Sequence, residues 1–383
     1  MQVVVIFMRY LDPGGQQQTV GGVETYIEQL GLLAAALGWQ PVVVQCAARS
    51  FDLSVGPVRV IGVPCRLEQS TTAIGRTLYP AAIKRVLRPE DILIFGTDLL
   101  VVPTGNPRAI VIQHGISFDL PIRYISPRRW LRRWPFARLY RVFNAYRAVR
   151  AFENCRNHVC VDYNFYNWYR TLATSEELHR VWVIPNFTAT LSQIGHRRDE
   201  ATDGTVRLIF ARRFVDYRGS RLMADALSQI LSKQLPVEMT FAGEGPDEVY
   251  LRNRFGNDPR VRFIRYRPSE AVQIHCCADI AIVPSIASEG TTFSVAEAMA
   301  AGCAVVATHV GGITNMIIDG YNGLLIPPSA AALQTALERL INDGDLRRRL
   351  GQRAQQVAEA SFGLERWRRQ WTEVLTTVAG EPG

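Results

Sequence analysis

The stretch from Ala278 to Gly302, ADIAIVPSIASEGTTFSVAEAMAAG, restricts the fold of this chain more than any other part of the sequence. Its apolar run Ile280–Val283 is typical of a buried strand, which Pro284 ends. The Ala- and Met-rich run Phe293–Ala301 is typical of a packed helix, which the following glycine stops. The stretch therefore predicts a strand, a loop and a helix in succession.

A second apolar run, Ala304–Ala307, follows this helix at once and predicts another strand. Strand, loop, helix and strand form a βαβ unit, whose two strands lie parallel. Open α/β sheets bind ligands outside the carboxyl ends of their strands. The loop that contains Glu289 and Gly290 is therefore the expected binding site.

Two carboxylates, Glu289 and Glu297, mark this loop and helix and are separated by seven residues. If the helix begins near Thr292, both carboxylates are able to face one cleft. The free backbone amides of Thr292, Phe293 and Ser294 would point into it and favour an anionic or hydroxyl-rich ligand. A second interpretation stays open from the spacing alone, in which Glu289 caps the helix and Glu297 is a solvated side chain.

Length and composition set the class of protein. A chain of 383 residues exceeds one ordinary core and predicts two domains, and 48% apolar residues predict a globular protein. No apolar run reaches the roughly 18 residues that span a bilayer, and MQVVVIF reads as a first strand rather than a signal peptide.

The seven cysteines form no CxxC pair and lie largely in apolar surroundings. They are Cys46, Cys65, Cys155, Cys160, Cys276, Cys277 and Cys303. The pattern predicts a reduced, cytoplasmic protein without structural zinc.

Strand and helix patterns alternate through both halves, which predicts parallel sheets covered by helices. The strands expected in the first half are Val3–Phe7, Pro41–Cys46, Val58–Val63, Ile92–Phe95, Ile110–Gln113, His158–Val161 and Val181–Ile184. Those expected in the second half are Arg207–Ala211, Val237–Ala242, Val261–Arg265, Ile280–Val283 and Ala304–Ala307. Helical spacing marks Val23–Leu37, the region between Ile74 and Leu87, and Ser329–Val378.

The segment Pro185–Thr205 is polar and irregular, so the domain junction is expected there. The predicted domains are residues 1–190 and 191–362, followed by a terminal helix at 363–383. Two Rossmann-like domains with a ligand between them form the simplest architecture for this pattern.

Eight sequence elements resemble one known family. They are VWVIPN, FARRFVDYRG, FAGEGP, RVRFIRYRPSEAV, ADIAIVPS, EGTTFSVAEAMAAG, VVATHVGG and DGYNGLLIPP, in this order. The series is similar to the carboxyl domain of the family 4 (group 1) retaining glycosyltransferases over residues 181–362, with weaker support from GGVETYIEQLGLLAAALGWQPVVV and IQHG. The resemblance implies the GT-B fold, with parallel sheets facing across a cleft. It also implies an acceptor domain at 1–190, a nucleotide-sugar domain at 191–362, and a last helix that packs back towards the amino domain.

The resemblance assigns roles to four charged residues. Glu289 is expected beside the hydroxyls of the donor sugar, and Glu297 is expected to accept hydrogen bonds from both ribose hydroxyls. The cations that hold the donor diphosphate fall on Arg213 and Arg218. Arg218 replaces a lysine of the family, which keeps the charge and changes the geometry. Without the resemblance, FARRF would be read as a strand end with solvated arginines.

The amino half supplies three further candidates. Gly21 and Gly22 precede a helix that opens at Val23, so that bare amides are able to approach a phosphate. His114, which follows a strand, matches a histidine that the family places near the donor sugar. Taken alone, the glycines would be read as a turn and the histidine as structural.

Several positions depart from the family pattern. Thr291, Thr292 and Phe293 stand where the family commonly has Phe-Gly-Leu, Arg212 occupies a usual glycine, and Asn315 a usual glutamate. PNFTA likewise replaces a common PNG. These departures predict a subgroup with its own donor.

The resemblance implies transfer of a sugar from a UDP- or GDP-linked donor to a glycan or lipid-linked acceptor hydroxyl, with retention, in bacterial surface polysaccharide, lipopolysaccharide or glycolipid assembly. No metal cofactor is expected, because Arg213, Arg218 and two helix amino termini would neutralise the leaving diphosphate. Nucleotide-sugar epimerases, sugar phosphorylases and non-catalytic sugar-nucleotide-binding proteins of the same fold stay open as alternatives.

The net charge of +8 lies wholly in the first half, where residues 1–190 hold 21 basic against 13 acidic residues; residues 191–383 hold 22 of each. No nucleic-acid partner is expected, because no reading motif is present.

The segment Arg123–Arg150 holds nine arginines and no acid. Its interleaved aromatics are Trp130, Trp134, Phe136, Tyr140, Phe143 and Tyr146. It predicts a peripheral contact with the anionic inner face of the cytoplasmic membrane. The alternative is that the aromatics pack in the core and the arginines are solvated or line an acceptor cleft.

Overall fold

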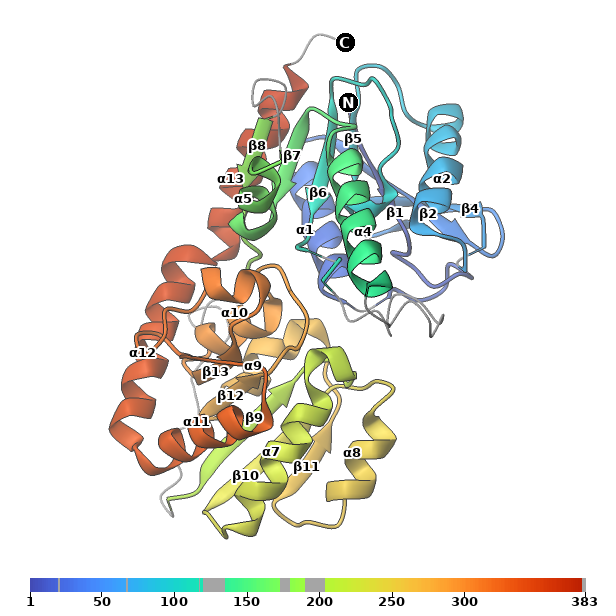
Figure 1. The fold of residues 1–383 in the computed structure, drawn as a ribbon. Coiled ribbons are helices and arrows are strands. Elements are labelled where there is room, and N and C mark those ends of the chain that lie inside the picture. The colour runs from blue at the N-terminus through green and yellow to red at the C-terminus, as the bar shows by residue number, and fades with distance from the viewer. Residues whose placement is uncertain are drawn as a thin grey trace. The chain divides into compact units, whose positions relative to one another are not determined.

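A computed structural model describes residues 1–19, 21–66, 68–116, 118–119, 135–172, 180–189 and 204–380 (Figure 1). The chain divides into two compact units. The amino-terminal unit comprises Met1–His114, Trp130–Ile184 and Trp367–Gly383, and the carboxyl-terminal unit comprises Gly115–Arg129 and Pro185–Arg366. Each unit contains a sheet covered by helices, so the predicted α/β class with two Rossmann-like sheets is confirmed.

The sheet of the amino-terminal unit has eight strands in the order β3-β4-β2-β1-β5-β6-β7-β8. Their bounds are β1 Gln2–Phe7, β2 Gln40–Ala47, β3 Phe51–Val55, β4 Val58–Pro64, β5 Ile92–Phe95, β6 Ala109–Gln113, β7 Asn157–Cys160 and β8 Arg180–Val183. All neighbours pair in parallel except β3 and β4. Apart from the edge strand β3, the sheet is wound as in a Rossmann fold. The chain starts at β1 in the middle of the sheet and adds later strands outwards on both sides.

Apolar composition explains why these strands occupy the interior. β2, β5, β6 and β7 are buried almost throughout, because helices cover the sheet and leave neither face to water. The helices of this unit are α1 Gly22–Ala36, α2 Thr71–Arg85, α4 Phe136–Phe152, α5 Tyr163–Arg170 and α13 Leu364–Ala379, with the short 3-10 helix η1 at Asp98–Leu100.

The antiparallel strand β3 was not expected from the sequence. β3 and β4 form a hairpin through Gly56, whose φ of 55° lies in the left-handed region that favours glycine. Alternating exposure along β3 shows that this edge strand is only half-buried. The predicted all-parallel arrangement is therefore wrong at this edge of the sheet.

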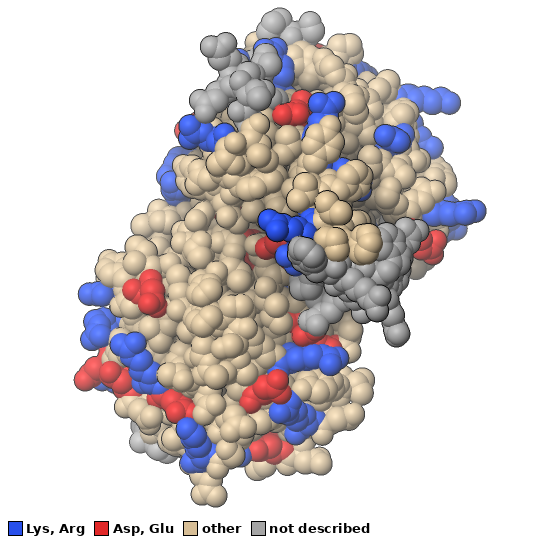
Figure 2. Space-filling model, in the orientation of Figure 1, with Lys and Arg blue, Asp and Glu red and all other residues tan. Residues whose placement is uncertain are grey.

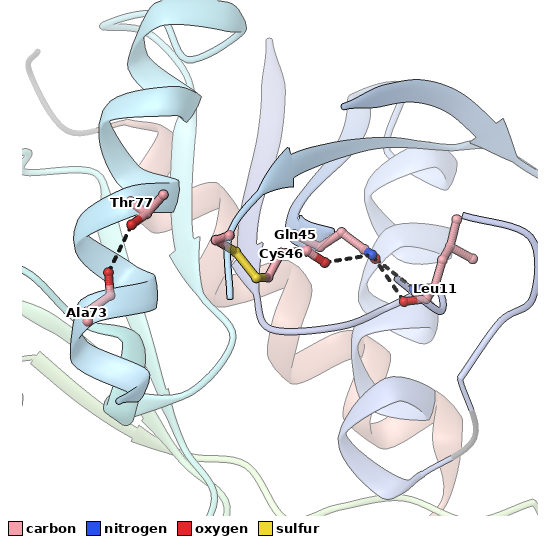
Figure 3. The surroundings of a disulfide bond; sticks show 6 residues. Leu11, Gln45, Cys46, Ala73 and Thr77 are labelled. Atoms are coloured by element: carbon pink, nitrogen blue, oxygen red, sulfur yellow. Dashed lines mark hydrogen bonds between the residues drawn. A yellow bond between two sulfur atoms is a disulfide. The ribbon is translucent and has the colours of Figure 1, made fainter. Parts of the chain in front are cut away.

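A disulfide joins Cys46 at the end of β2 to Cys65 just after β4, with the two Cα atoms 5.5 Å apart (Figure 3). The expectation that all cysteines are reduced is wrong for this pair, because parallel pairing of β2 with β4 brings together residues that lie 19 positions apart. Beside it, the Gln45 side-chain amide donates to the carbonyl of Leu11 at 3.0 Å and fixes the loop after β1.

Helix α13 completes the core of the amino-terminal unit from the far end of the chain. Trp367 and Trp371 are almost fully buried, and the Trp371 Nε1–H donates to the hydroxyl of Tyr26 on α1 at 2.7 Å. The rings of Tyr26 and Trp367 meet edge to face with centroids 5.1 Å apart. The last helix thus belongs to the unit that contains the first strand.

The carboxyl-terminal unit has a six-stranded, wholly parallel sheet in the order β11-β10-β9-β12-β13-β14. Its strands are β9 Val206–Ala211, β10 Val237–Ala242, β11 Val261–Ile264, β12 Ile280–Val283, β13 Ala304–Thr308 and β14 Leu324–Ile326. Its helices are α7 Ser220–Ser232, α8 Glu248–Phe255, α9 Ala271–His275, α10 Phe293–Ala300, α11 Ala330–Asn342 and α12 Gly344–Ser361, with 3-10 helices η3 Asp216–Arg218, η4 Pro268–Glu270 and η5 Gly311–Asn315. The strand order reverses between β9 and β12, which is where such sheets bind ligands.

A buried ion pair fixes β9 beside β12. The Arg207 guanidinium donates from Nη2 to Asp279 Oδ1 at 2.9 Å and from Nε to Oδ2 at 3.0 Å. Both side chains are at most 5% exposed, so water does not screen this bidentate pair. On the outer surface, exposed pairs such as Lys233–Glu338 are spread over the unit, and Figure 2 shows acidic side chains beside basic ones on the visible face.

Replacing Trp371 with alanine tests the contribution of α13. We expect the amino-terminal unit to lose about 3–5 kcal/mol of unfolding free energy, because a large buried ring is removed and the Tyr26 hydroxyl loses its donor. All seven tryptophans lie in the residue ranges of this unit, so tryptophan fluorescence in urea follows its unfolding. Arg369→Ala, on the exposed face of the same helix, is the control and should change stability by less than about 0.5 kcal/mol. Equal stability of W371A and wild type would contradict this account.

Candidate functional site

Two loops leave the carboxyl-terminal sheet at the point where its strand order reverses. The first follows β9 and runs through Arg212 to Arg218, and the second follows β12 and runs from Pro284 to Thr292. β9 and β12 are hydrogen-bonded neighbours, so the two loops start side by side. Side chains about 70 residues apart in the sequence therefore meet at this edge.

The carboxylate of Glu289 is the centre of this cluster and is buried. Its Oε1 accepts hydrogen bonds from the Arg212 guanidinium at 2.7 Å and from the hydroxyl of Ser285. Its Oε2 accepts from the Arg218 guanidinium. Glu289 is thus held by two cations and one hydroxyl, and the interpretation of Glu289 as a simple helix cap does not describe its contacts.

Arg212 is the most deeply buried cation of the cluster, with 4% of its side chain exposed. Its Nη2 donates to Glu289 and its Nη1 donates to the Ser285 hydroxyl at 2.8 Å, so both ends of the guanidinium fork are used. Burial lowers the pKa of Arg212 to about 10, which leaves the group charged at neutral pH. Its Nε–H is buried and has no hydrogen-bond partner among the described residues.

Arg218 and Arg213 differ in exposure from Arg212. The Arg218 side chain is 35% exposed, and burial together with Arg212 lowers its pKa to about 10. Arg213 is exposed, and its charge also lowers the Arg218 pKa to a smaller extent. The cluster therefore contains one cation inside the protein and two that reach its surface.

Backbone contacts hold the Glu289 loop close to neighbouring glycines. Gly312 donates its N–H to the Glu289 carbonyl at 2.6 Å, and Gly311 has a φ of 53°. A Cβ on Gly311 would meet the Glu289 backbone nitrogen at 2.6 Å, so a larger residue does not fit. Gly219, with a φ of 86°, lies equally close to the Pro284 carbonyl and brings Arg218 next to β12.

Glu297 lies on α10, within electrostatic range of Arg212 and Tyr266. Burial raises the pKa of the Glu297 carboxyl to about 7, and Arg212 acts in the opposite direction. Burial, and then the Glu297 charge, raises the pKa of Tyr266, so the phenol is neutral. Arg212 therefore acts on both glutamates that the sequence singles out, by a hydrogen bond to Glu289 and by its charge on Glu297.

Helix α10 presents an amino terminus without a side-chain cap. Its N-cap is Thr292, which makes no capping hydrogen bond, and the helix begins at Phe293, within one residue of the expected start. Free amides at the start of a helix favour an anion. Gly302, with a φ of 72°, ends the helix as predicted.

Departures from the family pattern contact one another. The Asn186 backbone N–H donates to the Thr291 hydroxyl at 2.8 Å, and the Asn186 amide donates to the Thr291 carbonyl. The Phe187 and Phe293 rings meet edge to face with centroids 5.3 Å apart. The segments PNFTA and EGTTF therefore pack against each other.

The other three candidates lie in the amino-terminal unit. Gly21 and Gly22 lie at the start of α1, and the N-cap residue Gly21 has no side chain to cap the helix. His114 follows β6, and its Nε2 lies 2.9 Å from the Gly96 carbonyl, which requires the proton on Nε2. Burial lowers the His114 pKa to about 4, so the imidazole is neutral at pH 7.

The structure brings four sequence-predicted residues into one region, namely Glu289, Glu297, Arg218 and Arg213. Sequence reasoning missed Arg212 and Ser285 as parts of the site, and it named Arg212 only as a departure from a usual glycine. An arginine directly after the apolar run at residues 208–211 was the available signal, because a buried strand end seldom holds an unpaired cation. Among the described residues, no three His, Cys, Asp or Glu side chains gather as metal ligands. No described helix is long and apolar enough to cross a bilayer.

Comparison with solved structures defines the class of fold. Sucrose-phosphate synthase from Thermosynechococcus elongatus aligns with 99% of each chain, a TM-score of 0.76 and 18% identity. Anabaena HepE, solved with UDP and glucose, aligns with 98% of this chain and all of its own, with a TM-score of 0.67 and 17% identity. The predicted GT-B fold is confirmed.

Sequence comparison then shows which proteins the chain resembles. Residues 205–343 match the family described as "Glycosyl transferases group 1". The D-inositol 3-phosphate glycosyltransferase of Corynebacterium urealyticum is 25% identical over 326 residues, which cover 73% of this chain and 76% of that relative. The corresponding protein of Corynebacterium efficiens is 33% identical over 156 residues, and that alignment covers 38% of this chain and 37% of the relative. The predicted resemblance to group 1 glycosyltransferases is confirmed.

Glu297 should make the stability of the protein depend on pH. Its folded pKa of about 7 lies above the ordinary value of 4.5, so the folded state binds the extra proton, and the unfolding free energy falls as pH rises from about 4.5 to 7. Glu297→Gln removes this dependence. We expect the variant to be more stable than wild type at pH 8 and equal to it near pH 4.5, as measured by circular dichroism in urea. A difference that does not change with pH would contradict the assignment.

Proposed function

We propose that this protein is a glycosyltransferase that moves a sugar from a nucleotide-sugar donor to an acceptor hydroxyl. The observation that carries the proposal is the cluster of Glu289 with Arg212 and Arg218 at the switch point of the sheet, inside the segment that matches the group 1 family. HepE, which shares the fold, was solved with UDP and glucose, and this supports a UDP-linked donor, with a GDP-linked donor as the other candidate.

Positive charge in the cluster suits a departing diphosphate. We assign the diphosphate to Arg213 and Arg218, whose side chains reach the surface, and to the free amides at the start of α10, which include those of Thr292, Phe293 and Ser294. Fixed donors of this kind stabilise the charge that develops on the leaving group. The proposed reaction uses these groups and no metal.

The two glutamates take the sugar and the ribose. Glu289 Oε2, which accepts from Arg218 in this structure, is suited to a sugar hydroxyl, and Glu297 is suited to the ribose hydroxyls once it is ionised. We propose a retaining reaction in which the departing phosphate oxygen helps to deprotonate the acceptor on the same face of the sugar.

The amino-terminal unit is assigned to the acceptor, which we propose is a glycan or a lipid-linked sugar in surface polysaccharide or lipopolysaccharide assembly. His114 is neutral and carries its proton on Nε2, which leaves Nδ1 as a hydrogen-bond acceptor. We propose that Gly21 and Gly22, at the start of α1, add bare amides for the donor phosphates.

Incubation of the protein with a panel of UDP- and GDP-sugars tests the proposal by the release of nucleoside diphosphate. We expect slow release with one donor, a large loss of turnover in Glu289→Gln, and a loss of about tenfold or more in Arg218→Ala, because a charge-assisted contact is worth about 1.5–3 kcal/mol. Arg252→Ala, on the surface of α8, is the control for loss of charge.

Each other outcome identifies an alternative function. Isomerised sugar without acceptor would indicate an epimerase, and a requirement for free phosphate would indicate a phosphorylase. Binding of a nucleotide sugar without any turnover would indicate a non-catalytic binding protein.

We also propose that α4 rests on an anionic membrane surface. Of the segment Arg123–Arg150, residues 123–134 lie outside the described residues, and Phe136–Arg150 lies on α4. Phe136, Phe143 and Tyr146 are 46%, 55% and 59% exposed, so packing of these aromatics in the core is ruled out.

The exposed apolar side chains of α4 form one stripe. They are Phe136, Leu139, Val142, Phe143 and Tyr146, which are each more than 45% exposed and are related by spacings of three and four residues. Arg138, Arg141, Arg147 and Arg150 lie on the same helix, and the segment from Leu120 to Phe152 contains no acid. Apolar side chains with a surplus of arginine match an interface of acyl chains and anionic head groups.

Sedimentation with vesicles tests this contact. Wild type should sediment at low salt with vesicles that contain phosphatidylglycerol and remain in solution with phosphatidylcholine alone. Arg147→Gln with Arg150→Gln, which change the two exposed arginines nearest the stripe on the helix, should weaken binding by roughly 30-fold, since each arginine contributes about 1 kcal/mol. The matched control changes the exposed residues Arg252 and Arg265 of the carboxyl-terminal unit to glutamine, which removes the same charge elsewhere. Failure of wild type to bind anionic vesicles would refute the membrane contact.

A further inference from the structure

Glu289 has two cationic partners, and the proposed function requires one of them, Arg218, to bind the donor diphosphate. Arg218 donates to Glu289 Oε2 in this structure, and it is also the cation assigned to the donor diphosphate. A diphosphate carries more negative charge than one carboxylate and competes for the same guanidinium. When the donor binds, Arg218 must loosen or share its hold on Glu289.

Arg212, in contrast, is not assigned to the diphosphate. Its side chain is 4% exposed, against 35% for Arg218, and both ends of its guanidinium are already bonded inside the unit, to Glu289 and Ser285. Ser285 is fully buried and is itself fixed, because its carbonyl accepts from the Thr308 hydroxyl at 2.6 Å. Arg212 is therefore a cation that remains with Glu289 whatever Arg218 does.

We propose that Arg212 is a positioning residue that holds the Glu289 carboxylate in place and charged while Arg218 passes to the diphosphate of the donor. This inference rests on the proposed function and adds to it a residue that acts through Glu289 and does not touch the donor. The exchange makes Glu289 Oε2 available to a sugar hydroxyl at the moment the diphosphate arrives. Binding of the leaving group and recognition of the sugar are thereby coupled.

The planar fork of arginine suits this position better than the single ammonium of lysine. One guanidinium spans Ser285 and Glu289 through two different nitrogens, at 2.8 and 2.7 Å. Lysine would place one nitrogen where two are used, and it would lose more hydration on burial. We therefore expect Arg212→Lys to recover only part of the function lost in Arg212→Gln.

Kinetics and binding of Arg212→Gln separate positioning from donor binding. With the donor that wild type uses, kcat should fall by about tenfold or more, because Glu289 is no longer held in the transition state. Affinity for UDP or GDP alone, whichever binds wild type, should change by less than about threefold by calorimetry at about pH 9, where Glu297 is ionised in both proteins. Arg213→Gln is the matched comparison, since it removes an adjacent charge from the diphosphate site and should mainly weaken nucleotide binding.

A double-mutant cycle with Glu289→Gln tests whether Arg212 acts through Glu289. If it does, the double variant should have nearly the kcat of E289Q alone, so that the two losses do not multiply. Multiplying losses would overturn the inference, as would an unchanged kcat in R212Q. Thermal unfolding of every variant checks that it is folded, and R212K supplies a folded comparison if R212Q is not.

The pH profile supplies a readout that a purely structural arginine would not move. The described groups that act on Glu297 are Arg212 after β9 and Tyr266 after β11, and Arg212 lowers the Glu297 pKa. Removal of Arg212 should therefore shift the acid limb of kcat/KM from near pH 7 to higher pH. An unshifted limb would contradict the electrostatic part of the inference.

Binding also tests the exchange without any turnover. In E289Q the carboxylate no longer competes for Arg218, so UDP or GDP should bind several-fold more tightly than to wild type. Weaker binding would overturn the exchange. A wild type that releases nucleoside diphosphate from no donor would refute the proposed function itself, whereas a working wild type with a normal R212Q would refute this inference alone.

Discussion

The bidentate pair between Arg207 and Asp279 is the interaction on which the carboxyl-terminal unit depends. It joins the beginnings of β9 and β12, the two strands between which the order of the sheet reverses. In a parallel sheet, the register of two strands fixes where their carboxyl ends lie. This ion pair at the amino ends of β9 and β12 therefore decides which side chains meet at their carboxyl ends. The side chains of Arg212, after β9, and Glu289, after β12, meet there because the two strands cannot slide.

Much of this arrangement could be predicted from the sequence. The strand at Ile280–Val283, the helix at Phe293 and its end at Gly302 follow from apolar runs and glycine, because these signals are local. The family pattern named Glu289 and Arg218, and the structure brings them into contact. Their roles towards a donor remain proposals.

Other features depend on contacts between distant residues, and local signals do not show them. The buried position of Arg212 follows from the partners that Ser285 and Glu289 supply more than 70 residues later. The disulfide of Cys46 with Cys65 requires the neighbouring positions of β2 and β4. The antiparallel strand β3 was hidden because its alternating pattern is short and its face is half-exposed.

The placement of α13 has a consequence for how the chain is made. Trp367 and Trp371 fill the core of the amino-terminal unit beside Tyr26, although about 340 residues separate them in the sequence. A ribosome makes these rings after it has made Pro185–Arg366. The residues of the second unit are thus made while the first still lacks part of its interior, and a nascent chain carries an open apolar groove until Trp367 and Trp371 emerge. A truncation that removes Trp367 and Trp371 therefore acts on the unit that contains β1, far away in the sequence.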